Sequence, residues 1–380
     1  MDVRGRASRW RPAGLGGLGG PEGVGADRSI DGFGFDVREA RKPVRAVQYV
    51  DLETGTGVGE VADPSPGPED VVVAVEACGL CGSDVHALQA GQPAAGAILG
   101  HEFSGRIVAL GSDVTGWAEG QPVAASPIGS CGKCRVCARG IPFRCPAVPN
   151  IGINTQGAYA EYARVPARQL VALPAELDVE LGSHAEPLSV GRQAVKLAQV
   201  GPGDPVLVYG VGPIGLYAII ALKLAGAGPI VAAGRSAGRR AAAADVGADV
   251  VIDTREISVA EYAAQAGTLF AAVLECSAAS GAFNQALAVT EPGGTVVEVA
   301  LTPESASVPL FPLISEGHHV VGSCAFSDQT YRESVEYLAS GQVPVGRLVS
   351  ERVSLDDTPD ALRRLQTPGT LVRIIARPWQ

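Results

Sequence analysis

Hydrophobic positions divide the chain into two kinds of segment. In the first half, short β-type runs rich in Val and aromatic residues are separated by turns containing Gly and Pro, at residues 45–50, 71–76, 103–110, 121–125 and 157–162. Runs of this length and composition predict a small β-barrel or meander. The first half is therefore predicted to be β-rich.

After residue 184 the pattern changes to strands alternating with helices. Short buried-type strands are predicted at 205–209, 230–233, 250–252, 271–275 and 295–299, with helices at 184–200, 216–225, 239–246 and 283–289. This alternation predicts a doubly wound parallel sheet. The last segment, with a helix at 331–339 and a strand at 371–376, is predicted to return to the first domain.

The fold prediction is therefore an α/β protein, with a β-rich domain and a doubly wound nucleotide-binding domain. The predicted divisions are 1–42, 43–189, 190–325 and 326–380. Residues 1–42 contain four early arginines and a Gly-rich run without hydrophobic periodicity. We interpret them as a disordered extension or a start codon placed too early, with a transit-like segment as a weaker third option. No apolar stretch follows the arginines, so no secretory signal is predicted.

Composition narrows the class of protein. The 380 residues carry a formal charge of −10, which argues against a general nucleic-acid binder because phosphate binding needs clustered Lys and Arg. The chain has no apolar run of about 18 residues, so no membrane span is predicted. Most of the eight cysteines stand in close, metal-type spacings, which favours a reducing cytoplasm over a disulfide framework.

The stretch from Cys78 to Glu102 holds the first set of candidate metal ligands. Thiolate and imidazole bind zinc well, and a catalytic zinc has three protein ligands and one open position. We assign Cys81 and His101 as ligands, with Glu102 and the later Glu186 as candidates for the remaining protein position. A further set of residues would support this site: Asp84 to orient the imidazole, and Ser83 and His86 to carry a proton away.

Four cysteines form a second set, at Cys131, Cys134, Cys137 and Cys145. Spacings of two, two and seven intervening residues match a closed, all-cysteine structural zinc site that braces a loop. An iron–sulfur cluster is the alternative, because a Cys-x2-Cys-x2-Cys run with a final Cys-Pro is typical of such clusters. The last gap is too long for the bacterial ferredoxin pattern, which favours zinc, and colour would distinguish the two. The chain is thus predicted to hold two zinc ions.

A glycine motif follows the strand at 205–209. Residues 210–215 read Gly-Val-Gly-Pro-Ile-Gly and precede a predicted helix, so we assign Gly210, Gly212, Pro213, Ile214 and Gly215 to the dinucleotide. The glycines permit a tight turn and close approach of the pyrophosphate to the helix N-terminus.

The end of the second strand of this domain predicts the type of cofactor. NAD-specific sites carry Asp or Glu there, about twenty residues past the glycines, to bind the ribose hydroxyls. This chain instead has Gly234, then Arg235 and Ser236, with Arg239 or Arg240 as possible helpers. Arginine and a hydroxyl can bind a 2′-phosphate. We therefore predict NADP over NAD, the alternative being that these arginines are solvated residues at a helix start.

Taken together, residues 44–378 resemble the zinc-dependent medium-chain dehydrogenase/reductase superfamily, and most closely its sorbitol and threonine dehydrogenase branch. The motifs that carry the resemblance are CGSDVH at 81–86, GHE at 100–102, the four cysteines, Glu-Pro at 186–187 and GVGPIG at 210–215. The resemblance implies a GroES-like catalytic domain around a Rossmann domain. It also implies a proton path from Ser83 to His86, a zinc position shared by Glu102 and Glu186, and a homodimer or homotetramer.

Two positions depart from the sorbitol dehydrogenases. Ala87 stands where they carry Tyr, and Ala325-Phe326 where they carry Arg-Tyr. The predicted function is therefore NADP(H)-dependent oxidation or reduction of a secondary alcohol or ketone bulkier or less hydroxylated than sorbitol. One alternative is an NAD-dependent polyol or threonine-type dehydrogenase. The other is a zinc- and nucleotide-binding protein without turnover.

Overall fold

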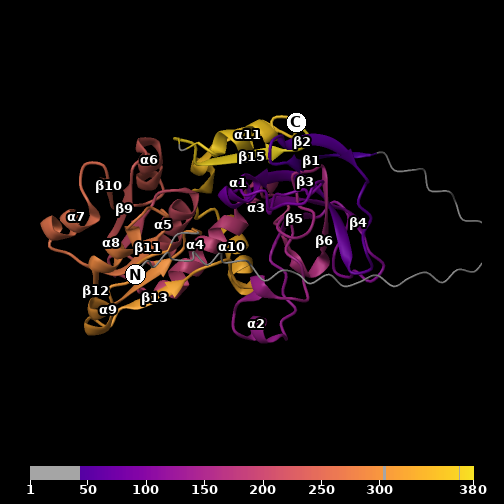
Figure 1. The fold of residues 1–380 in the computed structure, drawn as a ribbon. Coiled ribbons are helices and arrows are strands. Elements are labelled where there is room, and N and C mark those ends of the chain that lie inside the picture. Colours follow the sequence, from indigo (N-terminus) through magenta and orange to yellow (C-terminus); the bar gives the residue numbers. More distant parts are fainter. Residues whose placement is uncertain (1–42, 303–304, 368) are drawn as a thin grey trace, which may run out of the picture. The chain divides into compact units, whose positions relative to one another are not determined.

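The computed structural model describes residues 43–302, 305–367 and 369–380. In this part of the chain the strands form sheets of two, six and seven strands (Figure 1). Residues 1–42, interpreted above as an extension, lie outside the described residues. Within the described ranges, no helix combines the length and the apolar character needed to cross a bilayer.

The β-rich part consists of a hairpin and the seven-stranded sheet. The hairpin pairs β1 (Val44–Asp51) with β2 (Gly55–Val61). The sheet has the order β14-β15-β3-β4-β5-β7, with β6 also on β3. Its strands are β3 (Asp70–Gly79), β4 (Glu102–Leu110), β5 (Pro122–Ala125), β6 (Tyr162–Pro166), β7 (Leu170–Ala172), β14 (Val349–Ser354) and β15 (Arg373–Arg377). The last strand, β15, pairs antiparallel with β3, so the end of the chain joins this sheet (Figure 1).

The six-stranded sheet is parallel throughout and has the order β10-β9-β8-β11-β12-β13. Its strands are β8 (Val206–Tyr209), β9 (Ile230–Gly234), β10 (Val250–Asp253), β11 (Phe270–Glu275), β12 (Thr290–Glu298) and β13 (His319–Gly322). Strand order reverses between β8 and β11, which creates the crevice in which such sheets bind ligands. The predicted doubly wound sheet is therefore confirmed, and His319 begins its edge strand.

Helices cover both faces of this sheet because its strands are apolar on both sides. Val206 and Val208 of β8 belong to one hydrophobic core with α4, α5 and α10, whereas Leu207 belongs to another with α7 and α8. The α-helices of the whole described part of the chain, including those beside the seven-stranded sheet, are α1 (Gly82–Gln89), α2 (Arg135–Ala138), α3 (Val179–Gly182), α4 (Ala185–Ala198), α5 (Pro213–Ala225), α6 (Ala237–Asp245), α7 (Val259–Ala266), α8 (Ala282–Ala288), α9 (Leu310–Ser315), α10 (Asp328–Ala339) and α11 (Thr358–Leu365).

One predicted strand is misplaced. The sequence predicted a strand over 157–162, but β6 begins only at Tyr162. The preceding residues instead lie against the segment before β4: Gly157 N donates to Ile98 O, and Ala158 N to Gly100 O. A side chain at Gly157 would collide with the carbonyls of Leu99 and Gly100, so close backbone approach replaces regular pairing here.

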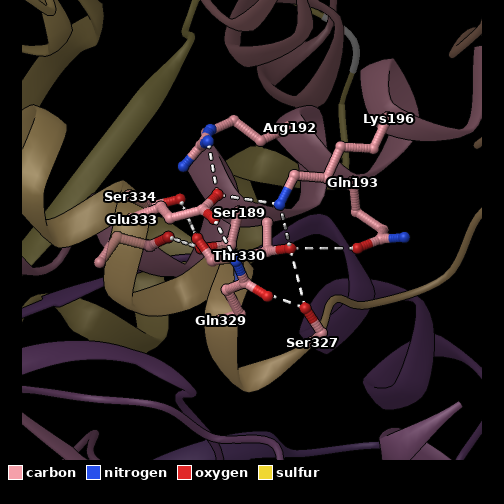
Figure 2. Close-up of polar contacts among 10 residues, drawn as sticks. Ser189, Arg192, Gln193, Lys196, Ser327, Gln329, Thr330, Glu333 and Ser334 are labelled. Atoms are coloured by element: carbon pink, nitrogen blue, oxygen red, sulfur yellow. Dashed lines mark hydrogen bonds and ion pairs between the residues drawn. The ribbon is translucent and has the colours of Figure 1, made fainter. Parts of the chain in front are cut away.

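A polar network joins α4 to α10 and fixes their relative position (Figure 2). Ser189 Oγ donates to Ser334 Oγ at 2.9 Å, and both residues are fully buried. Arg192 and Lys196 both contact Glu333, at 2.8 and 2.9 Å. Polar contacts of this kind between two helices favour one arrangement of the pair. The network therefore helps to fix α4, whose first turn carries one of the candidate zinc ligands.

Candidate functional site

Strands β3 and β4 bring the first set of candidate ligands together. Gly79 at the end of β3 pairs with Glu102 at the start of β4. Cys81 follows β3 as the N-cap of α1, and His101 immediately precedes β4. One ligand atom each of Cys81, His101 and Glu102 lies within 4.8 Å of the others. Sequence positions twenty residues apart are thus adjacent at one end of the sheet.

A buried carboxylate, that of Asp84, faces the His101 imidazole. His101 Nδ1 lies 3.2 Å from Asp84 Oδ1. Asp84 Oδ2 in turn accepts a hydrogen bond of 2.6 Å from the Tyr159 hydroxyl. An imidazole whose second nitrogen faces a carboxylate is the usual arrangement of a metal-binding histidine. His101 Nε2 is therefore left to face the candidate metal position.

Glu102 is held by a buried arginine from the end of the chain. Arg373 Nη1 contacts Glu102 Oε2, and Arg373 Nη2 donates to Ser183 O at 2.8 Å. Both charged side chains are almost completely buried. The absence of a side chain at Gly79 provides the space for this pair, since a Cβ there would collide with both. The ion pair fixes one carboxylate oxygen of Glu102.

Glu186 lies outside the group of three. It is buried in the first turn of α4. Burial, and next the charge of Glu102, raise the pKa of the Glu186 carboxyl to about 8. His184, two residues earlier, is also buried and lies outside the group; its Nδ1 is 2.6 Å from the Tyr217 hydroxyl.

The chemistry of the three donors fits a zinc ion. Thiol, imidazole and carboxylate in one group are the ligand types of catalytic zinc sites. Burial raises the pKa of the Cys81 thiol, so its thiolate form requires a neighbouring cation. Ser83 Oγ donates to Cys81 Sγ at 3.2 Å and lies 3.4 Å from His101 Nε2. Ser83 is exposed, and so is His86 one turn further along α1.

The four cysteines of the second set also lie together. Their sulfur atoms are all within 4.8 Å of one another, and none forms a disulfide. Cys134 is the N-cap of α2, and its sulfur is 4.0 Å from that of Cys145. Ser130 Oγ donates to Cys137 Sγ at 3.5 Å and lowers the pKa of that thiol to about 6. Four sulfurs about one point fit a closed tetrahedral zinc site.

The glycine motif forms the turn between β8 and α5. Gly210 has φ of +111°, and a side chain there would collide with Cys276 and Ser277. At Gly215 a Cβ would collide with the carbonyl of Gly210. Gly212, the N-cap of α5, has open space beside it, and Pro213 opens the helix. The motif therefore leaves an open helix N-terminus at which a pyrophosphate fits.

At the end of β9, the predicted phosphate-binding residues have different surroundings. Gly234 ends the strand, and a Cβ there would collide with the side chain of Val211. Arg235 is exposed. Ser236 Oγ donates to Gly369 O at 3.2 Å, and Arg239 Nε donates to Leu371 O at 3.0 Å. Ser236 and Arg239 thus hold the segment before β15, a role that the sequence did not indicate.

The sequence analysis missed Tyr159 and Arg373, which contact candidate zinc-site residues, and the charged pair of Asp253 and Arg255 at the end of β10. Tyr159 stood in an apparent strand and gave no signal. Arg373 interrupts the apolar run Leu371 to Ala376, and a charge in a buried strand normally requires a partner. Asp253 ends the short apolar strand β10, at the sheet edge where ligands bind. The charges of Arg373 and Asp253 are visible in the sequence, but nothing along the chain identifies the residues that pair with them.

Comparison with known proteins identifies the family. Residues 67–175 match the family described as alcohol dehydrogenase GroES-like domain, and residues 213–340 match zinc-binding dehydrogenase. The chain is 33% identical over 361 residues to scyllo-inosose 3-dehydrogenase of Thermotoga maritima, covering 83% of this chain and 88% of that protein. It is 32% identical over 327 residues to sorbitol dehydrogenase of Bacillus subtilis, covering 83% and 92%.

A solved structure also indicates similarity to zinc-binding dehydrogenases. A zinc-binding dehydrogenase from Sinorhizobium meliloti bound to NADP superposes with a TM-score of 0.83 at 32% identity, covering 89% of this chain and all of the other. The superposition over 89% of this chain shows that the two proteins share their fold. The chain belongs to the zinc-dependent alcohol dehydrogenase family of medium-chain dehydrogenases/reductases and is an oxidoreductase.

Proposed function

We propose that this enzyme transfers a hydride between NADP(H) and a secondary alcohol or ketone that is bulkier or less hydroxylated than sorbitol. The observation that carries the chemistry is the convergence of Cys81, His101 and Glu102 within 4.8 Å. Zinc bound there would supply a Lewis acid that lowers the pKa of the alcohol, and the nucleotide would accept the hydride. Two zinc ions per chain are proposed, the second in the four-cysteine site.

The roles of the chain's own residues follow from their positions. Asp84 holds the His101 imidazole through Nδ1, and Tyr159 holds Asp84. Ser83 Oγ, within 3.4 Å of both the Cys81 sulfur and His101 Nε2, is proposed to accept the substrate's proton while its own O–H proton passes on toward His86. His86 is exposed and is proposed to pass that proton to solvent. Glu186 is proposed as the alternative carboxylate to Glu102.

Sulfur spacing supports zinc over an iron–sulfur cluster in the second site. Ligands about 2.3 Å from a single tetrahedral zinc stand about 3.8 Å from one another. The four sulfurs lie within 4.8 Å of one another, which suits one ion. Cysteines that bind different irons of a cluster stand further apart, so a colourless protein is expected.

The proposed substrate class rests on two small residues. Ala87 is half-buried on α1, and Ala325 is half-buried before α10. Phe326, expected beside Ala325 in the pocket wall, is instead buried and stacks on Tyr331 with ring centroids 5.6 Å apart. Ala87 and Ala325 are proposed to leave the pocket wall without the polar side chains that the sorbitol dehydrogenases carry there. A screen of secondary alcohols and ketones should favour larger, less polar compounds; equal turnover of sorbitol would contradict this.

NADP preference rests on the end of β9, where Gly234 replaces a carboxylate and an exposed arginine follows it. Parallel fluorescence titrations with NADPH and NADH at matched ionic strength test it. A tenfold preference for NADPH, about 1.4 kcal/mol, is expected. Preference for NADH would instead favour the polyol or threonine-type alternative.

A further inference from the structure

A cluster of charged side chains lies beside Gly234, at the end of the neighbouring strand β10. Asp253 ends β10, and it is the register partner of Gly234 at the end of β9. Thr254 N donates to Gly234 O at 3.3 Å, so the two strand ends are joined by their backbones. A carboxylate is therefore present at this edge of the sheet, but one strand away from the position that NAD-binding proteins use.

Asp253 is not free to bind ribose hydroxyls, because two arginines occupy it. Arg240 Nη1 lies 2.9 Å from Asp253 Oδ2, and Arg255 Nη2 lies 2.5 Å from the same oxygen. Arg255 Nε and its backbone N each donate to Asp253 Oδ1 at 3.0 Å. The Asp253 side chain is only 7% exposed. We refer to Arg240, Asp253 and Arg255 as the β10 clamp.

The clamp is bonded to the end of β9, the strand end at which dinucleotide-binding sheets hold the adenine-side ribose. Arg240 Nη1 also donates to Arg235 O at 2.7 Å, which ties it to the residue after Gly234. Arg255 is 60% exposed and so presents its guanidinium to solvent. Two guanidiniums and one carboxylate leave one positive charge in the clamp; the neighbouring Glu256 carries a negative charge that also acts on Arg255, and the exposed Arg235 adds a positive one. By contrast, Ser236 and Arg239 are bonded to the backbone of Gly369 and Leu371.

We propose that Asp253 is a positioning residue for the 2′-phosphate of NADP, because it holds Arg240 and Arg255 as a preformed pair beside Gly234. This inference rests on the proposed NADP preference. An exposed arginine loses side-chain freedom when it binds a phosphate, and a carboxylate that already fixes the guanidinium reduces that cost. The planar guanidinium then offers its remaining N–H groups to the phosphate oxygens.

The Asp253→Asn variant separates this role from simple charge attraction. If the clamp acted only through its net charge, removing the Asp253 carboxylate would strengthen binding of the anionic phosphate. Positioning predicts the opposite, a roughly tenfold weaker affinity for NADPH with the affinity for NADH unchanged. Tighter NADPH binding, or an equal change for both nucleotides, would overturn the proposal. Both affinities are measured by fluorescence titration on the same folded protein, so zinc loading and turnover do not enter.

The variant Arg255→Gln provides a test that does not depend on a buried substitution. This variant should also weaken NADPH binding about tenfold and leave NADH binding unchanged. The double variant, Asp253→Asn with Arg255→Gln, should lose little more NADPH affinity than either single variant, because the two residues act as a unit. Additive losses, or none, would contradict the clamp. Adenosine 2′-phosphate, titrated by calorimetry as a competing probe, should follow the NADPH result.

The chain contains a matched control for the clamp. Glu180 is likewise 7% exposed and contacts two arginines, Arg352 and Arg377, but it belongs to the seven-stranded part of the protein. Glu180→Gln should leave the ratio of NADPH to NADH affinities unchanged. Arg363→Gln is the control for Arg255, with a side chain 59% exposed and paired to Asp360.

The outcomes also separate the two proposals. If the unaltered protein prefers NADH, the proposed NADP function fails, and this inference fails with it. If it prefers NADPH but Asp253→Asn and Arg255→Gln leave the ratio unchanged, only the role of the β10 clamp is refuted.

Discussion

The two groups of candidate zinc ligands differ in what holds them. Cys81, His101 and Glu102 are supported by side chains that arrive from residues 159 and 373, more than fifty positions away. The four cysteines lie in one segment of fifteen residues, 131–145, and the side chain that supports Cys137 comes from Ser130, directly before that segment. The first group is built by the tertiary fold, whereas the second is specified almost entirely by local spacing.

The difference in support suggests that the two groups of ligands have different roles, one in chemistry and one in folding. A site that must perform chemistry needs its ligands held in one orientation by surrounding side chains. A closed site of four thiolates reaches its geometry from the ion itself and contributes mainly to folding. Changes in the first group should therefore affect turnover, and changes in the second should affect stability.

The largest effect is expected for Cys81→Ser. Loss of a zinc ligand should remove roughly 4 kcal/mol of transition-state stabilisation, so turnover should fall about a thousandfold or more. Binding of NADPH, measured by fluorescence, should be largely unchanged. Cys78→Ser is the control, because Cys78 is buried nearby but belongs to neither ligand group. Retained turnover in Cys81→Ser would remove the zinc mechanism.

Cys134→Ser should give the opposite result. Losing one of four structural ligands should lower the free energy of unfolding by about 3 kcal/mol, and the metal content by one ion per chain. Turnover per folded molecule should stay within about twofold of the unaltered enzyme. Thermal unfolding and metal analysis measure these effects, with the exposed Arg135→Gln in α2 as control. A large loss of turnover without loss of stability would show that this loop has a catalytic role.

A smaller effect is expected for Tyr159→Phe. It removes the 2.6 Å hydrogen bond to Asp84, which orients His101. Loss of such a supporting contact should weaken zinc binding at this site by about tenfold. Competition with a chelator measures it, and the four-cysteine site provides an internal reference. Tyr162→Phe, whose ring packs edge-on against Trp379, should show no change.

The parts of the fold that could be predicted are those with local periodicity. The strand and helix around the glycine motif are specified by an apolar run, three glycines and a helical pattern in sequence. The strand predicted at 157–162 was misplaced because its apolar residues pack against the segment before β4 without regular pairing. Composition cannot distinguish these two uses of the same residues.

The candidate cofactor site shows the same limit. Gly234 and Arg235 could be identified as candidate cofactor-binding residues from their distance along the sequence to the glycine motif. Arg239 and Arg240 are adjacent in sequence, yet one donates to Leu371 O and the other contacts Asp253. Successive residues on a helix point about 100° apart, so their partners depend on what packs on each side. The contacts that separate them come from residues 13 and 132 positions away.

By itself, the sequence determined the family motifs, the order of strands and helices around the nucleotide, and the ligand types of both metal groups. These are local properties, fixed by spacing, residue chemistry and backbone freedom. Only the tertiary structure decided that Tyr159 holds Asp84, that Arg373 holds Glu102 and that Asp253 holds two arginines. A buried charge must find a partner, but which partner it finds depends on how distant strands pair and pack.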